Sequence, residues 1–275
     1  MNRQYLTFGG FDLPAGTLAA SGTTTASRVI GRLAMDGTLD LTTYVGINSG
    51  TTFGFSGGDN RSVVSHDGTA FWAAGNSTGG GIRYVPYANP ASTTSTLVSG
   101  TPSNDRVAVI YNGQLYMSSA SSPNVGINQV GTGLPTTTGN AATLLMIDNS
   151  PMPAGPSPYG FAFSSPTRVF VADDRAIGFG GGLGEYNFSG SAWSFTTKHT
   201  TGLTTGLKGV ALGTYNGAPT HYVTDSTGNL LRVDATTPGT FTLIASPPAN
   251  ALYRGVVQVP SALPAAASAE WSKIQ

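Results

Sequence analysis

The sequence contains no cysteine and few charged residues. The absence of cysteine excludes disulfides, thiolate metal sites and thiol catalysis. Charged residues make up only 9% of the chain, against about 25% in an average soluble domain. Lys and Arg together number 13, and so do Asp and Glu, so the formal net charge is zero. This balance gives no electrostatic reason to expect a nucleic acid or an anionic membrane as partner.

Long apolar segments are missing too. No apolar run reaches the ~18 residues needed to cross a bilayer, so we expect no membrane insertion. Residues 1–20 lack a basic region followed by an apolar stretch, so no signal peptide is visible. Glycine is abundant, at 38 residues, and Ser, Thr and Asn are frequent. This composition is typical of a β protein with uncharged polar strand faces and glycine-rich turns.

A short β-rich phrase occurs five times, at intervals of about 50 residues. We call the residues that begin these phrases the opening residues; they are Arg61, Arg106, Tyr159, Lys208 and Arg254. Tight hairpin turns are indicated after three of the phrases by the pairs Asp67-Gly68, Asn112-Gly113 and Asn216-Gly217. Each of the first four phrases is followed by three further β-rich segments. Four short strands per repeat is the pattern of a propeller blade.

The two ends of the chain complete this pattern. Residues 1–50 contain segments that fit a second, third and fourth strand, whereas 254–259 fits a first strand. Pairing 254–259 with 4–8 would close the ring and remove two exposed sheet edges. We therefore predict an all-β, five-bladed β-propeller of four-stranded antiparallel blades, with residues 1–260 as a single domain. The predicted blades are 254–260 with 1–50, 60–100, 105–150, 158–200 and 207–247, and a C-terminal tail follows at 261–275.

Several phrases resemble a family of uncharacterised secreted bacterial repeat proteins. The matching phrases are residues 59–75, 111–120, 130–139, 157–161 and 171–175. The resemblance covers the whole chain and implies a propeller-like module of a large exported or cell-surface protein. It therefore implies an extracellular or cell-surface location. Relatives in this family carry extra N-terminal strands, which suggests a truncated or blade-deleted form. The resemblance supplies no catalytic residues.

Most of the opening residues are cationic. The four cations are Arg61, Arg106, Lys208 and Arg254. Equivalent positions of a propeller converge on the mouth of its central channel, where a ring of cations would suit an anion or oxyanion. The alternative is that each cation bridges neighbouring blades through a carboxylate such as Asp59 or Asp105. Asn76 and Ser119, at the exits of second strands, complete the predicted ligand-binding set.

Carboxylates occupy second-strand exits in three blades. Asp12, Asp173 and Asp225 are predicted metal ligands, because hard oxygen ligands from separate loops suit Ca²⁺, Mg²⁺ or Mn²⁺. Asp173 and Asp174 are also predicted catalytic residues, as general acid and base, and Tyr159 would donate a hydrogen bond to a developing oxyanion. The alternative is that these aspartates cap turns.

Two functions remain open from the sequence. The favoured one is a ligand-binding or interaction module of an exported bacterial protein, binding an anionic small molecule, a glycan or a partner at the central funnel. The alternative is a hydrolase of esterase, phosphoesterase, lactonase or glycosidase type, with or without a divalent metal, with its site at the channel mouth. No organic cofactor is expected, because no βαβ unit surrounds the glycine-rich run at 178–184. We expect a monomer.

Overall fold

The computed structural model of the chain describes residues 5–14, 16–149 and 155–258. The predicted tail at 261–275 therefore lies outside the described residues. Strands account for most of the regular structure, and two short 3₁₀ turns are present, Ala20–Gly22 and Ile177–Phe179. The described residues contain no α-helix, and none of their helical segments is long and apolar enough to cross a membrane.

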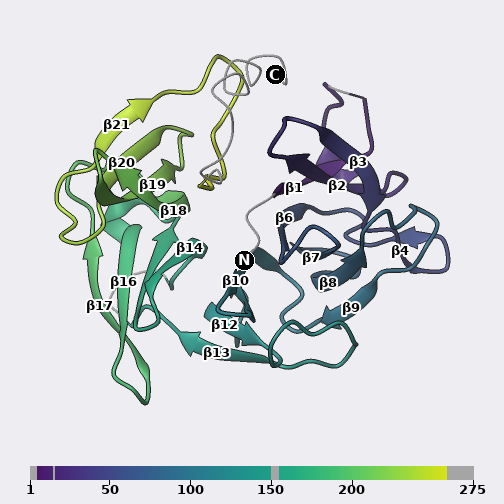
Figure 1. Cartoon of the computed structure of the whole chain (residues 1–275), viewed down its shortest axis with the longest axis horizontal. Coiled ribbons are helices and arrows are strands. Elements are labelled where there is room, and N and C mark those ends of the chain that lie inside the picture. The colour runs from purple at the N-terminus through teal and green to yellow at the C-terminus, as the bar shows by residue number, and fades with distance from the viewer. Residues whose placement is uncertain (1–4, 15, 150–154, 259–275) are drawn as a thin grey trace. The chain divides into compact units, whose positions relative to one another are not determined.

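Four sheets have four strands each, and in each sheet the strands follow one another in chain order (Figure 1). The first of these sheets contains β6 (Asn60–Ser65), β7 (Ala70–Gly75), β8 (Gly81–Pro86) and β9 (Thr96–Ser99). The second contains β10 (Asp105–Tyr111), β11 (Gln114–Ser119), β12 (Gly126–Val130) and β13 (Ala142–Met146). The third contains β14 (Pro158–Ser165), β15 (Arg168–Asp173), β16 (Gly182–Phe188) and β17 (Trp193–His199). The fourth contains β18 (Leu207–Tyr215), β19 (Ala218–Asp225), β20 (Leu230–Asp234) and β21 (Thr242–Ala245).

The N-terminal sheet has three strands among the described residues. It consists of β1 (Tyr5–Phe11), β2 (Arg28–Ala34) and β3 (Leu39–Tyr44). A small hairpin follows, formed by β4 (Ile47–Ser49) and β5 (Thr52–Phe53). The described strands follow the predicted order, except that residues 254–258 form no strand. The predicted fold class, an all-β propeller of five antiparallel blades, is confirmed.

The predicted closure of the N-terminal blade is not observed among the described residues. There β1 has only β2 as a ladder partner, and residues 251–258 form no strand. The C-terminal segment instead lies against the first strand of the blade before it. A Cβ on Gly209 would lie 3.2 Å from the carbonyl oxygen of Arg254. Likewise, a Cβ on Gly160 would lie 2.7 Å from the carbonyl oxygen of Lys208. Residues 254–256 therefore occupy the place of a next first strand beside β18, and glycine allows both close approaches.

The chain divides into two compact units. Among the described residues, unit 1 comprises 5–115 and 130–142, and unit 2 comprises 116–129 and 143–258. Unit 1 thus contains the N-terminal sheet, the sheet β6–β9 and β10, and unit 2 contains the sheets β14–β17 and β18–β21 and most of β11 to β13. The single-domain boundaries given above stay a prediction.

Each unit has its own apolar core. In unit 1, seven buried residues from the N-terminal sheet, the sheet β6–β9 and the segment between these sheets pack together: Ile30, Val45, Phe55, Val63, Phe71, Ala73 and Val85. In unit 2, nine buried residues of the last two blades pack together: Phe170, Ala172, Leu183, Leu207, Val210, Val223, Leu231, Val233 and Phe241. Because these residues alternate with more exposed ones along the strands, the sheets stack face to face and carry their loops together at the strand ends.

Candidate anion-binding site

Loops of unit 2 meet at the end where its first strands begin. We call residues 155–157, 174–181, 203–206, 226–229 and 251–254 the loop rim. The Ser226 amide donates a hydrogen bond to the Gly206 carbonyl at 2.8 Å. The Tyr253 amide donates to the Gly228 carbonyl at 3.2 Å, and the Ser226 hydroxyl lies 3.4 Å from the carbonyl oxygen of Asp174. These contacts hold the second-strand exits beside the opening residues, as the repeat predicted.

Three predicted site residues come together in unit 2. Tyr159 and Lys208 are half-buried on the adjacent strands β14 and β18, and Arg254 is exposed on the segment that follows them. The Arg254 guanidinium donates a hydrogen bond from Nη2 to the Tyr159 hydroxyl at 3.3 Å. Among the described residues, neither Lys208 nor Arg254 forms an ion pair with a carboxylate. The group therefore presents two uncompensated cations and a phenol, which can receive an anion.

Asp173 belongs to a separate network of alternating charges. Arg175 Nη2 lies 2.8 Å from Asp173 Oδ2 and 3.1 Å from Asp148 Oδ2. Lys198 Nζ lies 2.8 Å from Asp148 and 3.6 Å from Asp173. The Ser157 amide also donates to Asp173 at 3.1 Å. Two cations thus balance two buried carboxylates, so a divalent ion would have to displace a lysine or an arginine side chain.

The neighbouring predicted carboxylates have structural contacts. Asp174 accepts a hydrogen bond of 2.6 Å from the Ser157 hydroxyl. Asp225 accepts hydrogen bonds of 2.9 Å from the amides of Thr227 and Asn229, which is the turn capping weighed as an alternative. Burial works to raise the pKa of Asp225, but the hydrogen bonds from Asn229 and Thr227 outweigh it and hold this pKa below its ordinary value.

The predicted metal site is not assembled among the described residues. Asp12 is exposed directly after β1 in unit 1, whereas Asp173 and Asp225 belong to unit 2. Across residues 5–14, 16–149 and 155–258, no group of three or more His, Asp or Glu side chains is placed to hold a metal ion. The contacts of Asp173 and Asp225 agree better with ion pairing and turn capping than with the binding of a metal ion.

The predicted residues of unit 1 are arranged differently. Arg61 forms an ion pair with Asp59 at 3.5 Å and donates a hydrogen bond to Asn104, which precedes the next blade. It therefore bridges two blades through a carboxylate and an amide, the alternative weighed for the cations. Asn76 accepts a hydrogen bond of 2.7 Å from the amide of Asp59. Arg106 is half-buried on β10.

Ser119, the remaining predicted ligand-binding residue, ends β11 and is buried. Its hydroxyl accepts a hydrogen bond of 3.1 Å from the Ser121 amide. This local contact is typical of a serine that stabilises the turn after a strand.

The sequence analysis did not predict a buried polar position directly before the opening residues of two blades. Asn60 and Asp105 directly precede the opening residues of their blades and are buried. Among the residues that the structure describes, Asn60 Oδ1 and both carboxyl oxygens of Asp105 have no hydrogen-bond partner. Pro158 and Leu207 occupy the same position in unit 2. Burial raises the pKa of Asp105 well above its ordinary value, against the opposing charge of Arg61. A polar residue at a position that is apolar in other repeats is the signal that could have revealed it.

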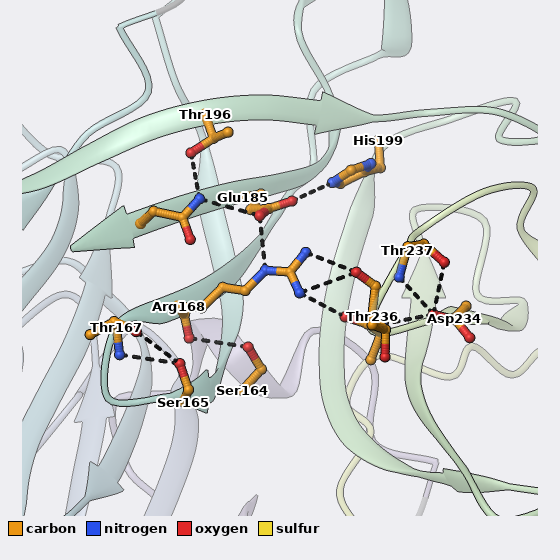
Figure 2. A network of polar contacts seen from close by, with 12 residues as sticks. Ser164, Ser165, Thr167, Arg168, Glu185, Thr196, His199, Asp234, Thr236 and Thr237 are labelled. Atoms are coloured by element: carbon orange, nitrogen blue, oxygen red, sulfur yellow. Dashed lines mark hydrogen bonds and ion pairs between the residues drawn. The ribbon is translucent and has the colours of Figure 1, made fainter. Parts of the chain in front are cut away.

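A second missed feature is the network around Glu185 in unit 2 (Figure 2). The carboxylate of Glu185 accepts from Arg168 Nε at 2.8 Å and contacts His199 Nε2 at 2.9 Å. Arg168 also donates to the carbonyl of Thr236 at 3.3 Å, which Figure 2 shows on the far side of the guanidinium. Burial works to raise the pKa of Glu185, but the bonds from Arg168 and His199 lower it to about 2. The carboxylate is thus held ionised as a link between the last two blades.

Comparisons with known proteins add little beyond this geometry. No protein-family model matches the sequence, and no curated protein matches it. A solved structure from Bacteroides uniformis, provisionally described as a 6-phosphogluconolactonase, aligns with 88% of this chain and 67% of its own, at 12% identity and a TM-score of 0.44. Apo AztD from Citrobacter koseri aligns with 82% of this chain at 14% identity and a TM-score of 0.40. The alignment covers 60% of the AztD chain, less than two thirds of its length.

Proposed function

We propose that this protein is a binding module whose ligand carries an anionic group, held by Tyr159, Lys208 and Arg254. The observation that carries the proposal is the pair of cations in unit 2 that no described carboxylate neutralises. Three other cations of unit 2, Arg168, Arg175 and Lys198, are already paired with carboxylates. Unpaired cations at the ends of packed strands are free to exchange water for a ligand.

The ligand classes of the proposal are an anionic small molecule, an acidic glycan, or an acidic segment of a partner protein. Tyr159 adds a phenol hydroxyl beside these cations, where it accepts a hydrogen bond from Arg254. The proposal places the module in an exported bacterial protein, as the family resemblance suggests.

Contacts of the aspartates support binding over hydrolysis. A hydrolase would need Asp173 or Asp174 to exchange protons with a substrate, yet Asp173 is held by Arg175 and the Ser157 amide. Because these carboxylates already have side-chain cations and donors, we expect EDTA to leave ligand affinity unchanged.

The test is a calorimetric titration with D-glucuronate and with D-glucose as its uncharged counterpart, at low ionic strength. We expect glucuronate to bind and glucose to bind at least about tenfold more weakly. The double variant Lys208→Gln, Arg254→Gln should lose at least about tenfold in glucuronate affinity. Arg232→Gln is the matched control, because Arg232 lies 3.7 Å from the ring of Tyr215 and is not part of the loop rim. Equal affinity of the double variant and the control would refute the proposal.

A further inference from the structure

Two large apolar side chains of the loop rim are exposed to solvent. Leu252 is 57% exposed and lies two residues before Arg254. Phe179 is 53% exposed and lies in the loop that joins β15 to β16. A single exposed apolar side chain is ordinary. Leu252 shares its segment with the uncompensated Arg254, and Phe179 belongs to another loop of the same loop rim, so this end of unit 2 presents both charge and apolar surface.

Both apolar side chains are presented by loops that are held in place. The Leu252 side chain covers Gly228, where an added Cβ would lie 2.7 Å from Leu252 Cδ2. Arg175 Nη2 donates to the Gly180 carbonyl at 3.1 Å, and the Phe179 amide donates to the Ala176 carbonyl at 2.9 Å. Since the loops are fixed by these contacts, little ordering would oppose the binding of a ligand.

Two other exposed apolar side chains of unit 2, those of Tyr215 and Leu243, lie outside the loop rim. Tyr215 is 43% exposed, but the guanidinium of Arg232 covers its ring at 3.7 Å. Leu243 is 56% exposed, nearly the same as Leu252, and lies on β21, the last strand of its sheet. Leu243 therefore offers a control of equal exposure outside the loop rim.

We propose that the ligand of this site is an amphipathic anion, a carboxylate joined to an apolar body. This inference rests on the proposed function. The planar guanidinium of Arg254 matches the two oxygens of a carboxylate, and the ammonium of Lys208 adds a second charge. The apolar body lies against Leu252, two residues along the chain, and extends toward Phe179. Removing these side chains from water supplies affinity that the charged group alone does not.

The experiment compares hexanoate with acetate by titration followed by NMR. Four additional CH₂ groups give hexanoate an affinity at least about tenfold higher if only part of the chain is buried. Leu252→Ser and Phe179→Ser together reduce this ratio to about two or less and leave the acetate affinity unchanged. Leu243→Ser, the matched control, keeps the full ratio. A thermal melt of each variant confirms that it is folded.

The outcomes separate this inference from the function on which it rests. Equal affinities for hexanoate and acetate in the wild type, with loss of both in Lys208→Gln, Arg254→Gln, would overturn only the apolar body. Hexyl phosphate binding more than about tenfold tighter than hexanoate would overturn the carboxylate assignment. Binding of neutral hexanol as tight as that of hexanoate would overturn the role of the cations and the proposed function with it.

Discussion

The two units bury charge in opposite ways. In unit 1, Arg28 and Arg83 are the largest fully buried side chains, and within the described part of the chain their hydrogen bonds all go to neutral oxygens. In unit 2, Arg175 and Lys198 instead lie against the carboxylates of Asp148 and Asp173. Burial lowers the pKa of Arg83 to about 10, which shows that its cation is held at a cost. Unit 1 therefore uses buried cations to hold its loops through neutral oxygens, whereas unit 2 pairs its buried cations with nearby carboxylates.

The largest change in the free energy of unfolding is expected from Arg83→Met in unit 1. The side chain donates to the hydroxyl and carbonyl of Ser95, to Asn48 and to the Gly79 carbonyl at 2.8 to 3.0 Å. Its removal leaves these acceptors without a donor, so the free energy of unfolding should fall by about 3 to 5 kcal/mol. Urea unfolding of the variant and the wild type measures this fall in the free energy of unfolding. A loss below about 1 kcal/mol would show that the buried cation is not essential to unit 1.

Asp173→Asn should have a smaller effect in unit 2. The amide retains the shape of the carboxylate but no longer balances Arg175 and Lys198, while Asp148 still pairs with both. We expect a loss of about 2 kcal/mol in the free energy of unfolding, because one partner of each cation remains. Urea unfolding at low and high salt checks this. An unchanged midpoint would contradict the role given to the network.

Asp105→Leu should stabilise unit 1 by about 1 to 2 kcal/mol at pH 7, since Leu207 fills the equivalent position in unit 2. The raised pKa of Asp105 means that the folded protein retains this proton above the pH at which the unfolded chain releases it. Stability of the wild type is therefore lost as the pH rises above about 4.

The measurement for Asp105 is the difference in unfolding free energy between variant and wild type across pH. The difference should grow from pH 4 toward pH 8. Asp36→Leu, on an exposed turn of the same unit, serves as a control with the opposite sign, because hydrogen bonds from Thr38 lower the pKa of Asp36. A pH-independent gain for Asp105→Leu would show that the buried carboxyl titrates normally.

The smallest effect is expected for His221→Phe in unit 2. Both ring nitrogens of His221 lack a hydrogen-bond partner within the described parts of the chain, and burial lowers the pKa of His221 to about 4. The unfolded chain then takes up a proton near pH 6.5 while the folded protein stays neutral, so stability falls as the pH drops from about 6.5 toward 4. His221→Phe should remove this loss, which is about 1 kcal/mol at pH 6. Thermal melts at pH 6 and 8 check it, with the exposed His66→Gln as a control for a surface histidine.

The strand order could be read from the sequence because each repeat is local. Hairpin signals such as Asn112-Gly113 and the alternation of apolar residues specify neighbours that are close along the chain. Long-range pairs could not be read in this way. Asp173 was assigned to a metal, whereas its contacts with Lys198 arise only when the strands of its blade come together. The pair of Arg61 with Asp59 was predicted as an alternative because its members are two residues apart.

The most direct test of the binding site is a map of backbone amide shifts in unit 2 during titration with glucuronate. The account predicts the largest shifts at Tyr159, Lys208 and Arg254 and in the loop rim at 226–229. It predicts small shifts at the opposite end of the same strands, around Tyr215 and Arg232. Shifts concentrated at that opposite end, or spread evenly over both ends, would contradict the site.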